Sequence, residues 1–274
     1  MHGAIDLAFQ AGPGGKGGAR LARLYQRAPL RALFPVADGC GVTQAVLLTT
    51  SGGLVGGDRM DVRVAAGEGA AVLVTAQAAE KVYRSLGPAG RIGIRLTAAA
   101  GSWLEWLPQE TILFEGARLD RRTVIDAAPG ARVLAGEMLV FGRRARGEVM
   151  TRGGLREAWE VRCDGRLLWA DTLRAGGDLQ PVFAAASCLA GAAAVATAIY
   201  LGDGVEAALG LARDLTAAGS AGEMAAATLV GGLLVVRWLA RDPRRLRDAF
   251  ARFWVAMRHQ LGGWPAVLPR VWSV

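Results

Sequence analysis

The sequence predicts a mainly β protein of stacked antiparallel sheets, with two α-helices in its C-terminal part. Between residues 42 and 170, short runs alternate apolar and polar side chains, and Gly, Pro and Asp separate them. This alternation is typical of strands that bury one face, and frequent turns between such strands favour antiparallel neighbours. Asp164-Gly165 predicts a tight hairpin between two of these runs. The expected strands are 43–49, 60–64, 71–75, 91–96, 102–106, 111–114, 118–126, 131–141, 156–162 and 166–170.

The 274-residue chain is expected to form one domain behind a short tail. Residues 1–18 end in a glycine-rich stretch and predict a flexible N-terminal tail with nothing to pack. The domain then covers 19–274, with a first strand at 19–25, a β body of about 19–180 and a C-terminal segment of about 181–274. No internal repeat and no long low-complexity linker divides these parts.

The C-terminal segment predicts the order strand, helix, strand, helix. Asp203 and the acid three residues later resemble a capping box before an apolar helical stripe. Residues 228–238 are apolar almost throughout, which indicates a central strand. Asp242-Pro243 predicts the start of the second helix and Gly262-Gly263 its end. On that helix Phe253 falls on the apolar face, and Arg258 is expected away from it.

Composition excludes several classes of protein. With 52% hydrophobic and 20% charged residues, the chain is neither disordered nor fibrous. The net charge of +8 comes from scattered arginines in short runs without interleaved aromatics, so nucleic acid is not expected as a partner. Three distant cysteines without a CxxC pair indicate reduced thiols and a cytoplasmic location. Residues 182–201 are uncharged and long enough to span a membrane, but they are mostly alanine and are expected to be buried core.

A glycine-rich loop, Thr50-Ser-Gly-Gly-Leu-Val-Gly-Gly-Asp58, stands out in the β region. Gly52, Gly53, Gly56 and Gly57 are expected to shape its backbone, since glycine tolerates positive φ and close approach. The loop lacks both the G-x-G-x-x-G spacing before a helix and the Gly-Lys-Ser/Thr tripeptide of phosphate-binding loops. It therefore predicts a binding surface and not a nucleotide site.

Catalytic motifs are missing from the chain. It has only two histidines and no nucleophile elbow or HExxH sequence, so no catalytic residue is expected and the protein is predicted not to be an enzyme. So few His and Cys residues also argue against a tight metal site. An enzyme that relies on an unfamiliar carboxylate pair is a lower-ranking alternative.

Two groups of polar residues are candidates for a polar passage or a partner-binding surface. The first is acids in apolar neighbourhoods: Asp58, Glu105, Glu110, Glu115, Glu137 and Glu148. Carboxylate oxygens hold divalent ions loosely, as suits transfer. The second is Gln77, Lys81 and Tyr83, which share a face if their segment is extended. The alternatives are ion pairs with the many arginines for the acids and a solvated strand face for the second group.

At these residues the sequence resembles the urease accessory protein UreD family, called UreH in some bacteria. The resemblance rests on residues 50–58 and on Gln-Ala-Ala-Glu-Lys-Val-Tyr-Arg-Ser at 77–85. It continues in the same order with Leu-Glu-Trp-Leu-Pro-Gln-Glu-Thr-Ile-Leu-Phe at 104–114, with 141–148 and with Pro-Arg-Val-Trp at 269–272. It covers nearly the whole chain apart from the glycine-rich start.

The resemblance implies a non-catalytic maturation factor with a mostly β, helicoid-like fold and two helices. Members bind apo-urease and join UreF and the GTPase UreG, and they assist nickel insertion through an internal route. It implies no tightly bound cofactor and only transient nickel, with weak transit at Asp58 and Glu110. Onto this route it carries Asp58, Lys81, Tyr83, Glu105, Gln109 and Glu110, while Thr49-Thr-Ser51 replaces a His-Pro-Pro of some members. The alternative is a basic, β-rich RNA- or protein-binding module of another pathway.

Overall fold

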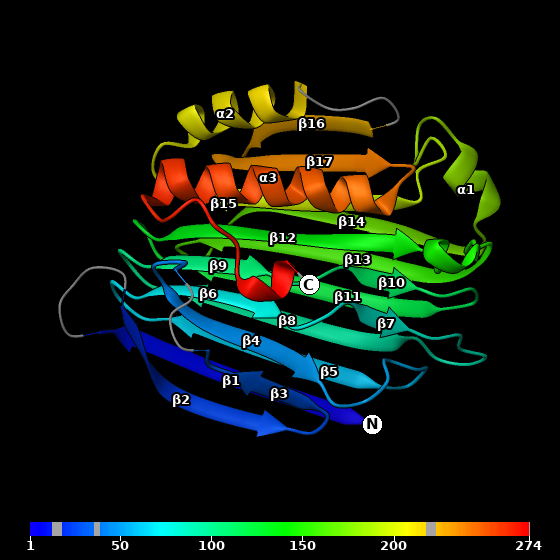
Figure 1. Cartoon of the computed structure of the whole chain (residues 1–274), viewed down its shortest axis with the longest axis horizontal. Helices are drawn as coiled ribbons and strands as arrows, with labels where there is room; N and C mark the ends of the chain where they lie inside the picture. Colours follow the sequence, from blue (N-terminus) through cyan, green and yellow to red (C-terminus); the bar gives the residue numbers. More distant parts are fainter. Residues whose placement is uncertain (13–17, 36–38, 218–222, 274) are drawn as a thin grey trace.

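The computed structural model describes residues 1–12, 18–35, 39–217 and 223–273, and it consists mainly of two stacked β-sheets (Figure 1). The first is a seven-stranded sheet with the order β14 (Arg166–Asp178), β13 (Arg152–Cys163), β11 (Arg118–Ala127), β8 (Gly90–Ala98), β5 (Arg59–Ala66), β1 (His2–Ala11) and β2 (Ala19–Arg27). The second is a ten-stranded sheet with the order β16 (Glu223–Val230), β17 (Leu233–Ala240), β15 (Ala194–Leu201), β12 (Arg132–Phe141), β9 (Trp103–Leu107), β6 (Ala71–Ala76), β4 (Thr43–Thr49) and β3 (Leu30–Leu33). The other two of its ten strands are short: β10 (Thr111–Leu113) pairs with β12, and β7 (Glu80–Val82) pairs with β10.

The body of the protein is a solenoid of parallel strands. The chain passes alternately through the two sheets, from β4 to β5, β6, β8, β9, β11, β12 and β13. Within each sheet these strands pair in parallel with one another. The prediction of stacked, helicoid-like β-sheets is confirmed, but the antiparallel pairing expected for this region is wrong. Each return to the same sheet is made by a strand of the other sheet, which provides the long crossover that parallel neighbours require.

The hairpin prediction at Asp164-Gly165 is confirmed, since β13 and β14 pair antiparallel around it. Both turn residues have positive φ, 52° and 72°, as a tight two-residue hairpin turn requires.

The N-terminal residues are not a flexible tail. His2–Ala11 forms β1, which lies between β2 and β5 and pairs in parallel with β5. Ile5, Leu7 and Phe9 alternate along it and are buried. The expectation for residues 1–18 is therefore wrong over this strand, while 13–17 lie outside the described residues. This alternation is typical of a half-buried strand, and it ends at the glycine-rich stretch that follows β1.

The C-terminal segment contains both predicted long helices, α2 (Val205–Ala217) and α3 (Pro243–Gly262). Asp242 caps α3 by accepting a hydrogen bond from Arg244 N at 2.9 Å, and Gly263 ends it in the left-handed conformation. The single central strand expected at 228–238 is instead the antiparallel pair β16–β17, because Gly231 and Gly232 turn the chain at positive φ.

A short helix, α1 (Gln180–Ala184), was not predicted, and single 3₁₀ turns lie at Arg144–Arg146 and Arg270–Trp272. Residues 182–201, expected to be buried core, divide between the end of α1, a connecting loop with exposed residues, and the largely buried strand β15. Within the residues described, no helix is long and apolar enough to cross a membrane.

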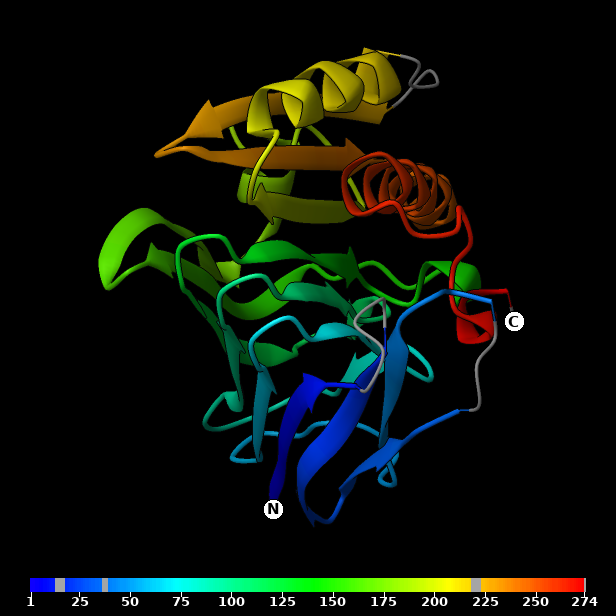
Figure 2. The same ribbon diagram turned by 90° about the vertical axis from the view of Figure 1, so that its left-hand side faces the viewer.

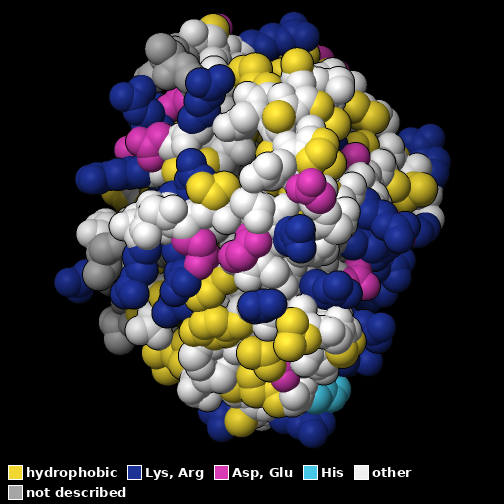
Figure 3. All heavy atoms as spheres, turned by 90° about the vertical axis from the view of Figure 1, so that its right-hand side faces the viewer, with side chains coloured by type: hydrophobic (Ala, Val, Ile, Leu, Met, Phe, Trp, Pro, Cys, Tyr) yellow, Lys and Arg dark blue, Asp and Glu magenta, His cyan; other side chains and the backbone are white. Residues whose placement is uncertain are grey.

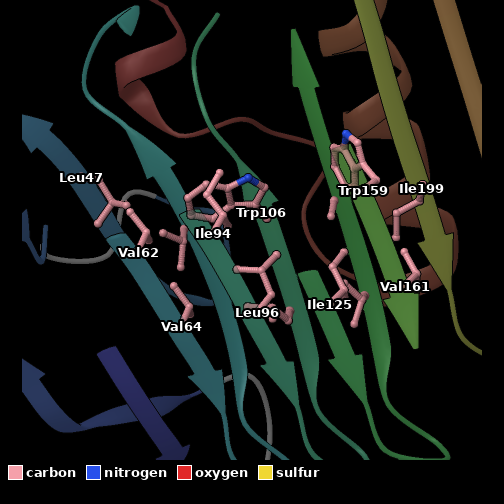
Figure 4. Close-up of a cluster of buried hydrophobic side chains, with 14 of the residues drawn as sticks. Leu47, Val62, Val64, Ile94, Leu96, Trp106, Ile125, Trp159, Val161 and Ile199 are labelled. Carbon is pink, nitrogen blue, oxygen red and sulfur yellow. The ribbon is translucent and has the colours of Figure 1, made fainter. Parts of the chain in front are cut away.

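Two hydrophobic cores lie on the two faces of the ten-stranded sheet. One fills the space between the sheets, where Leu96, Ile125, Trp159 and Ile199 meet (Figure 4). The other lies between the ten-stranded sheet and helices α2 and α3, which cover its outer face (Figure 2). Strand β12 is buried on both faces, with Val133, Ala135 and Leu139 toward the first core and Leu134, Met138 and Val140 toward the second. Since Glu137 keeps the alternation of the first set, its carboxylate lies between the two sheets.

Candidate functional site

A series of three cavities runs between the two sheets, and together they form what we term the passage. The first has a volume of about 220 Å³ and is lined by the loop after β4, the turn before β7, and Thr111, Arg121 and Glu137. The second, of about 30 Å³, shares Arg121 and Glu137 with the first. The third, of about 310 Å³, shares its lining residues Asp171, Leu173, Val195 and Thr197 with the second.

Both ends of the passage carry exposed residues. At the first end Gln77 and Lys81 are exposed, and at the other end Cys188 is exposed and Met224 is 49% exposed. Near the second end Asp171 forms an ion pair with Arg237 at 2.6 Å. The three cavities thus lie one after another between two different parts of the surface, and neighbouring cavities share lining residues.

Arg121 lies at the centre of the passage, between two carboxylates. Its Nε contacts Glu137 Oε2 at 2.5 Å and Glu157 Oε2 at 2.6 Å. Its Nη1 donates to Thr111 Oγ1 at 2.8 Å, and Thr123 donates to Glu137 Oε1 at 2.9 Å. Arg121 and Glu157 come from the seven-stranded sheet, whereas Glu137 and Thr111 come from the ten-stranded sheet. The three ionic side chains, termed the Arg121 cluster, therefore bridge the sheets.

Burial changes the acid–base behaviour of the Arg121 cluster. Arg121 and Glu137 are each 4% exposed and Glu157 is 6% exposed. Burial raises the pKa of Glu157 to about 8, and the neighbouring Glu137 adds to this effect against the opposing pull of Arg121. Burial disfavours the charge on Arg121, but the two carboxylates outweigh it and hold the pKa of this guanidinium above its ordinary value. The guanidinium is thus positively charged throughout the neutral range.

A further acid, Glu80, lines the first cavity. Its Oε2 accepts a hydrogen bond from Thr49 Oγ1 at 2.9 Å. Burial raises the pKa of Glu80 despite this hydrogen bond. The passage thus offers carboxyl groups at its first end and at its centre, and carboxylate oxygens are suitable donors for a divalent cation held briefly.

Several residues predicted from the sequence line this passage. Gly52, Gly53, Gln77, Lys81 and Gln109 all contribute to the first cavity. Gly53 has φ 147°, and a Cβ on it would lie 2.5 Å from Lys81 O, so the loop accepts only glycine there.

Tyr83 does not line the cavity but positions its wall. Its hydroxyl donates to Gly52 O at 2.9 Å, and its ring packs edge-to-face on Phe114. Gly56 and Gly57 also lie outside the lining. Gly56 packs against Ser85, and Gly57 has φ 83°.

Asp58 lies away from the passage, at the end of the glycine loop. Its Oδ1 pairs with the amino group of Met1, and its Oδ2 accepts a hydrogen bond from Val55 N at 3.0 Å. The side chain is buried and both of its oxygens are engaged within the protein. In this structure Asp58 therefore holds the loop and β1 together and does not face the cavities.

Glu105 and Glu110 also face away from the passage, toward helix α3. Glu105 is fully buried on the other face of the ten-stranded sheet, where Trp254 Nε1 donates to it at 2.7 Å and Arg258 Nε at 3.2 Å. Glu110 forms an ion pair with Arg247 at 2.5 Å. The expectation that Arg258 lies away from the buried face of α3 is wrong, because its guanidinium is the countercharge of Glu105.

Sequence reasoning missed most of the centre of the passage, although a signal for it exists. Arg121 follows Leu119 and precedes Thr123 and Ile125 at inward positions of β11, so period two already directs it inside. Glu157 likewise alternates with the buried residues Leu155 and Trp159 along β13, so it also points inward. Of the three residues of the Arg121 cluster, only Glu137 is among the acids that the sequence analysis proposed. The missed polar lining residues also include Glu80, Thr111, Asp171, Thr197 and Arg237.

The surface around the first end of the passage is mixed in character. The loops after β4 and β6 lie on the side of the molecule seen in Figure 3, where Lys and Arg side chains are spread between apolar patches and a few acids. In the part of the chain that is described, no three His, Cys, Asp or Glu side chains are grouped as metal ligands.

Known proteins resemble this chain over its full length. A family model described as UreD urease accessory protein matches residues 1–273. A protein named urease accessory protein UreD from Magnetococcus marinus is 45% identical, over 100% of this chain and 94% of that relative. Proteins of the same name from Methylobacterium sp. (strain 4-46) and Rhodopseudomonas palustris (strain BisA53) are 43% and 42% identical, over 97% and 93% of this chain and 93% and 86% of their own lengths. The chain belongs to the UreD family of urease accessory proteins.

Proposed function

We propose that this protein is a non-catalytic urease maturation factor of the cytoplasm that conducts nickel through the passage between its sheets. In this proposal it acts as the scaffold between apo-urease and a UreF–UreG complex, with each end of the passage facing a different partner. The observation that supports conduction is the series of three adjoining cavities between two exposed ends, with the buried carboxyl groups of Glu137 and Glu157 in its middle. Family membership supports the role in urease maturation.

The chemistry of the lining suits a transferred ion. Glu80, near the first end, and then Glu137 and Glu157 offer oxygen donors in sequence along the passage. Two carboxyl groups and a few hydroxyls bind a divalent cation more weakly than a site of several His and Cys ligands, so the ion is released again. The same residues offer no nucleophile with an adjacent base, which supports a conducting and not a catalytic role.

A matched pair of substitutions tests this function. Leu173 lines the second and third cavities, whereas its neighbour Thr172 is exposed on the opposite face of β14. In cells that co-express apo-urease and the other accessory proteins, Leu173→Trp is expected to lower the nickel content and activity of urease several-fold by filling the passage. Thr172→Trp is expected to leave both unchanged, because its indole points to solvent.

Two further measurements separate conduction from scaffolding. Both variants are expected to keep the thermal melt of the parent protein and to capture apo-urease equally well in a pull-down. Full urease activation by a correctly folded Leu173→Trp variant would refute conduction through these cavities. A protein that instead served as a nucleic-acid-binding module would lose affinity for RNA steeply with salt, which filter binding at two ionic strengths would reveal.

A further inference from the structure

The Arg121 cluster stands at the narrowest part of the passage. Arg121 and Glu137 line both the first cavity and the second, and the second cavity has a volume of only about 30 Å³. A space of this size accommodates about one small ion or water molecule at a time. An ion that moves from the first cavity to the third by way of the second passes the side chain of Arg121.

The guanidinium lies where the carboxylate oxygens converge. Oε2 of Glu137 and Oε2 of Glu157 both contact the same nitrogen, Arg121 Nε, so one positively charged group already bridges the two carboxyl groups. The guanidinium has this position because Nη1 is also fixed by Thr111 on the opposite sheet. Arg121 thus takes the place of the cation that the two carboxyl groups are arranged to bind.

The hydrogen bonding of the cluster is incomplete. Oε1 of Glu157 and Nη2 of Arg121 are buried, yet neither has a hydrogen-bond partner in the protein. Buried polar atoms are normally paired, and exceptions concentrate at functional sites. An unpaired carboxyl oxygen beside a cavity is an oxygen donor that a cation can use in addition to the contacts with the guanidinium.

We infer that Arg121 is the resident countercharge that stops Glu137 and Glu157 from retaining a divalent cation at the constriction, so that the ion is passed on. This inference rests on the proposed function. The guanidinium repels an arriving dication, and the two carboxyl groups attract it. Because the ion lies at nearly the same distance from the guanidinium and from the carboxyl groups, the repulsion offsets much of the attraction. An arginine suits this task because its charge persists at all physiological pH values. Its Nε also contacts both carboxyl groups at once.

The direct test measures nickel binding by the purified protein, without urease. Equilibrium dialysis against Ni²⁺ is expected to show that Arg121→Met binds one ion per chain at least about tenfold more tightly than the parent protein, because the opposing charge is gone. Adding Glu137→Gln and Glu157→Gln to that variant is expected to abolish the gain. Arg121→Lys keeps the charge and is expected to bind no more tightly than the parent.

Three results would overturn the inference. One is equal Ni²⁺ affinity in folded Arg121→Met and in the parent protein. The second is a gain that survives removal of both carboxylates, and the third is a gain that appears equally in Arg121→Lys. Circular dichroism confirms that each variant is folded before dialysis.

A second variant keeps the inference testable even if Arg121→Met fails to fold. Glu157→Gln preserves the shape of the cluster and the pairing of Arg121 with Glu137, but it removes one carboxyl group that can donate oxygen atoms to a cation. It is expected to lower urease nickel content several-fold on co-expression while apo-urease capture stays unchanged. Unimpaired activation by this variant would contradict the role of the carboxyl pair. Full activation by Leu173→Trp, in contrast, would refute the proposed function itself.

Discussion

The ion pair between Glu105 and Arg258 is predicted to be a principal attachment of helix α3 to the sheet, so that Glu105→Gln destabilises the whole protein. Both residues are fully buried. Glu105 accepts hydrogen bonds from Trp103 Nε1 at 2.8 Å, from Trp254 Nε1 at 2.7 Å and from Arg258 Nε at 3.2 Å. The guanidinium also donates to Cys40 O at 2.8 Å and to backbone oxygens of Pro265 and Val267, which tie down the chain after α3.

The expected cost follows from what remains after the substitution. A glutamine keeps the shape of Glu105 but removes the charge that balances the buried guanidinium of Arg258. Breaking a buried ion pair in this way costs about 3–5 kcal/mol. Since domains of this kind unfold with a free energy of about 5–15 kcal/mol, the loss is a large fraction of the total.

Urea unfolding followed by tryptophan fluorescence and circular dichroism measures this loss. The midpoint is expected to fall with little change in the slope, which would indicate lower stability of the same folded state. A double-mutant cycle with Arg258→Met is expected to show a coupling of about 2 kcal/mol or more, because the second substitution removes the uncompensated charge. A cost below about 1 kcal/mol for Glu105→Gln, or additive effects in the cycle, would refute the reasoning.

Two other substitutions test the second core and the titration of the passage. Phe253→Asp places a charge in the buried interface of α3 and is expected to lower the free energy of unfolding by at least about 4 kcal/mol. The control Arg252→Asp, on the exposed side of the helix, should change it by less than about 1 kcal/mol. Equal melting temperatures for the two variants would contradict this placement of Phe253. Because the pKa of Glu157 is raised to about 8, the folded protein binds an extra proton here, so this group's contribution to stability falls as pH rises from about 4.5 to about 8. Glu157→Gln is expected to flatten the dependence of melting temperature on pH across that window, and an unchanged profile would show that the carboxyl group is ionised like an exposed one.

The candidate residues illustrate why motif reasoning located only part of the passage. Gln77 and Gln109 lie on segments that connect strands, and Lys81 lies on the three-residue strand β7. All three line the first cavity, at one end of the stacked sheets. Asp58, Glu105 and Glu110 lie in equally distinctive motifs, yet their carboxylates are engaged by the N-terminus, Arg258 and Arg247. A motif identifies residues that the fold needs, but it does not distinguish a structural ion pair from a cavity lining. The partner of Glu105 is 153 positions away along the chain.

Much of the fold was predictable from local patterns. Period-two alternation located the strands of the body, Asp164-Gly165 located the β13–β14 hairpin, and Asp242 with Gly263 bounded α3. Each of these signals arises from a few neighbouring residues, through burial of one strand face, the φ angles of a turn or the free N–H groups of a helix end. The same alternation is present in β1, directly before the glycine-rich stretch.

What only the tertiary structure decided is which strands become neighbours and which buried charges meet. Alternation assigns a strand one inward face, but it carries no information about the direction of the neighbouring strand. Because no repeated motif marks the coils either, the sequence did not predict their parallel arrangement. The Arg121 cluster takes residues from β11, β12 and β13, and it exists only because successive coils stack in one register. The sequence by itself thus determined which side chains turn inward, and the stacking of the coils determined that three of them bridge the two sheets at the centre of one passage.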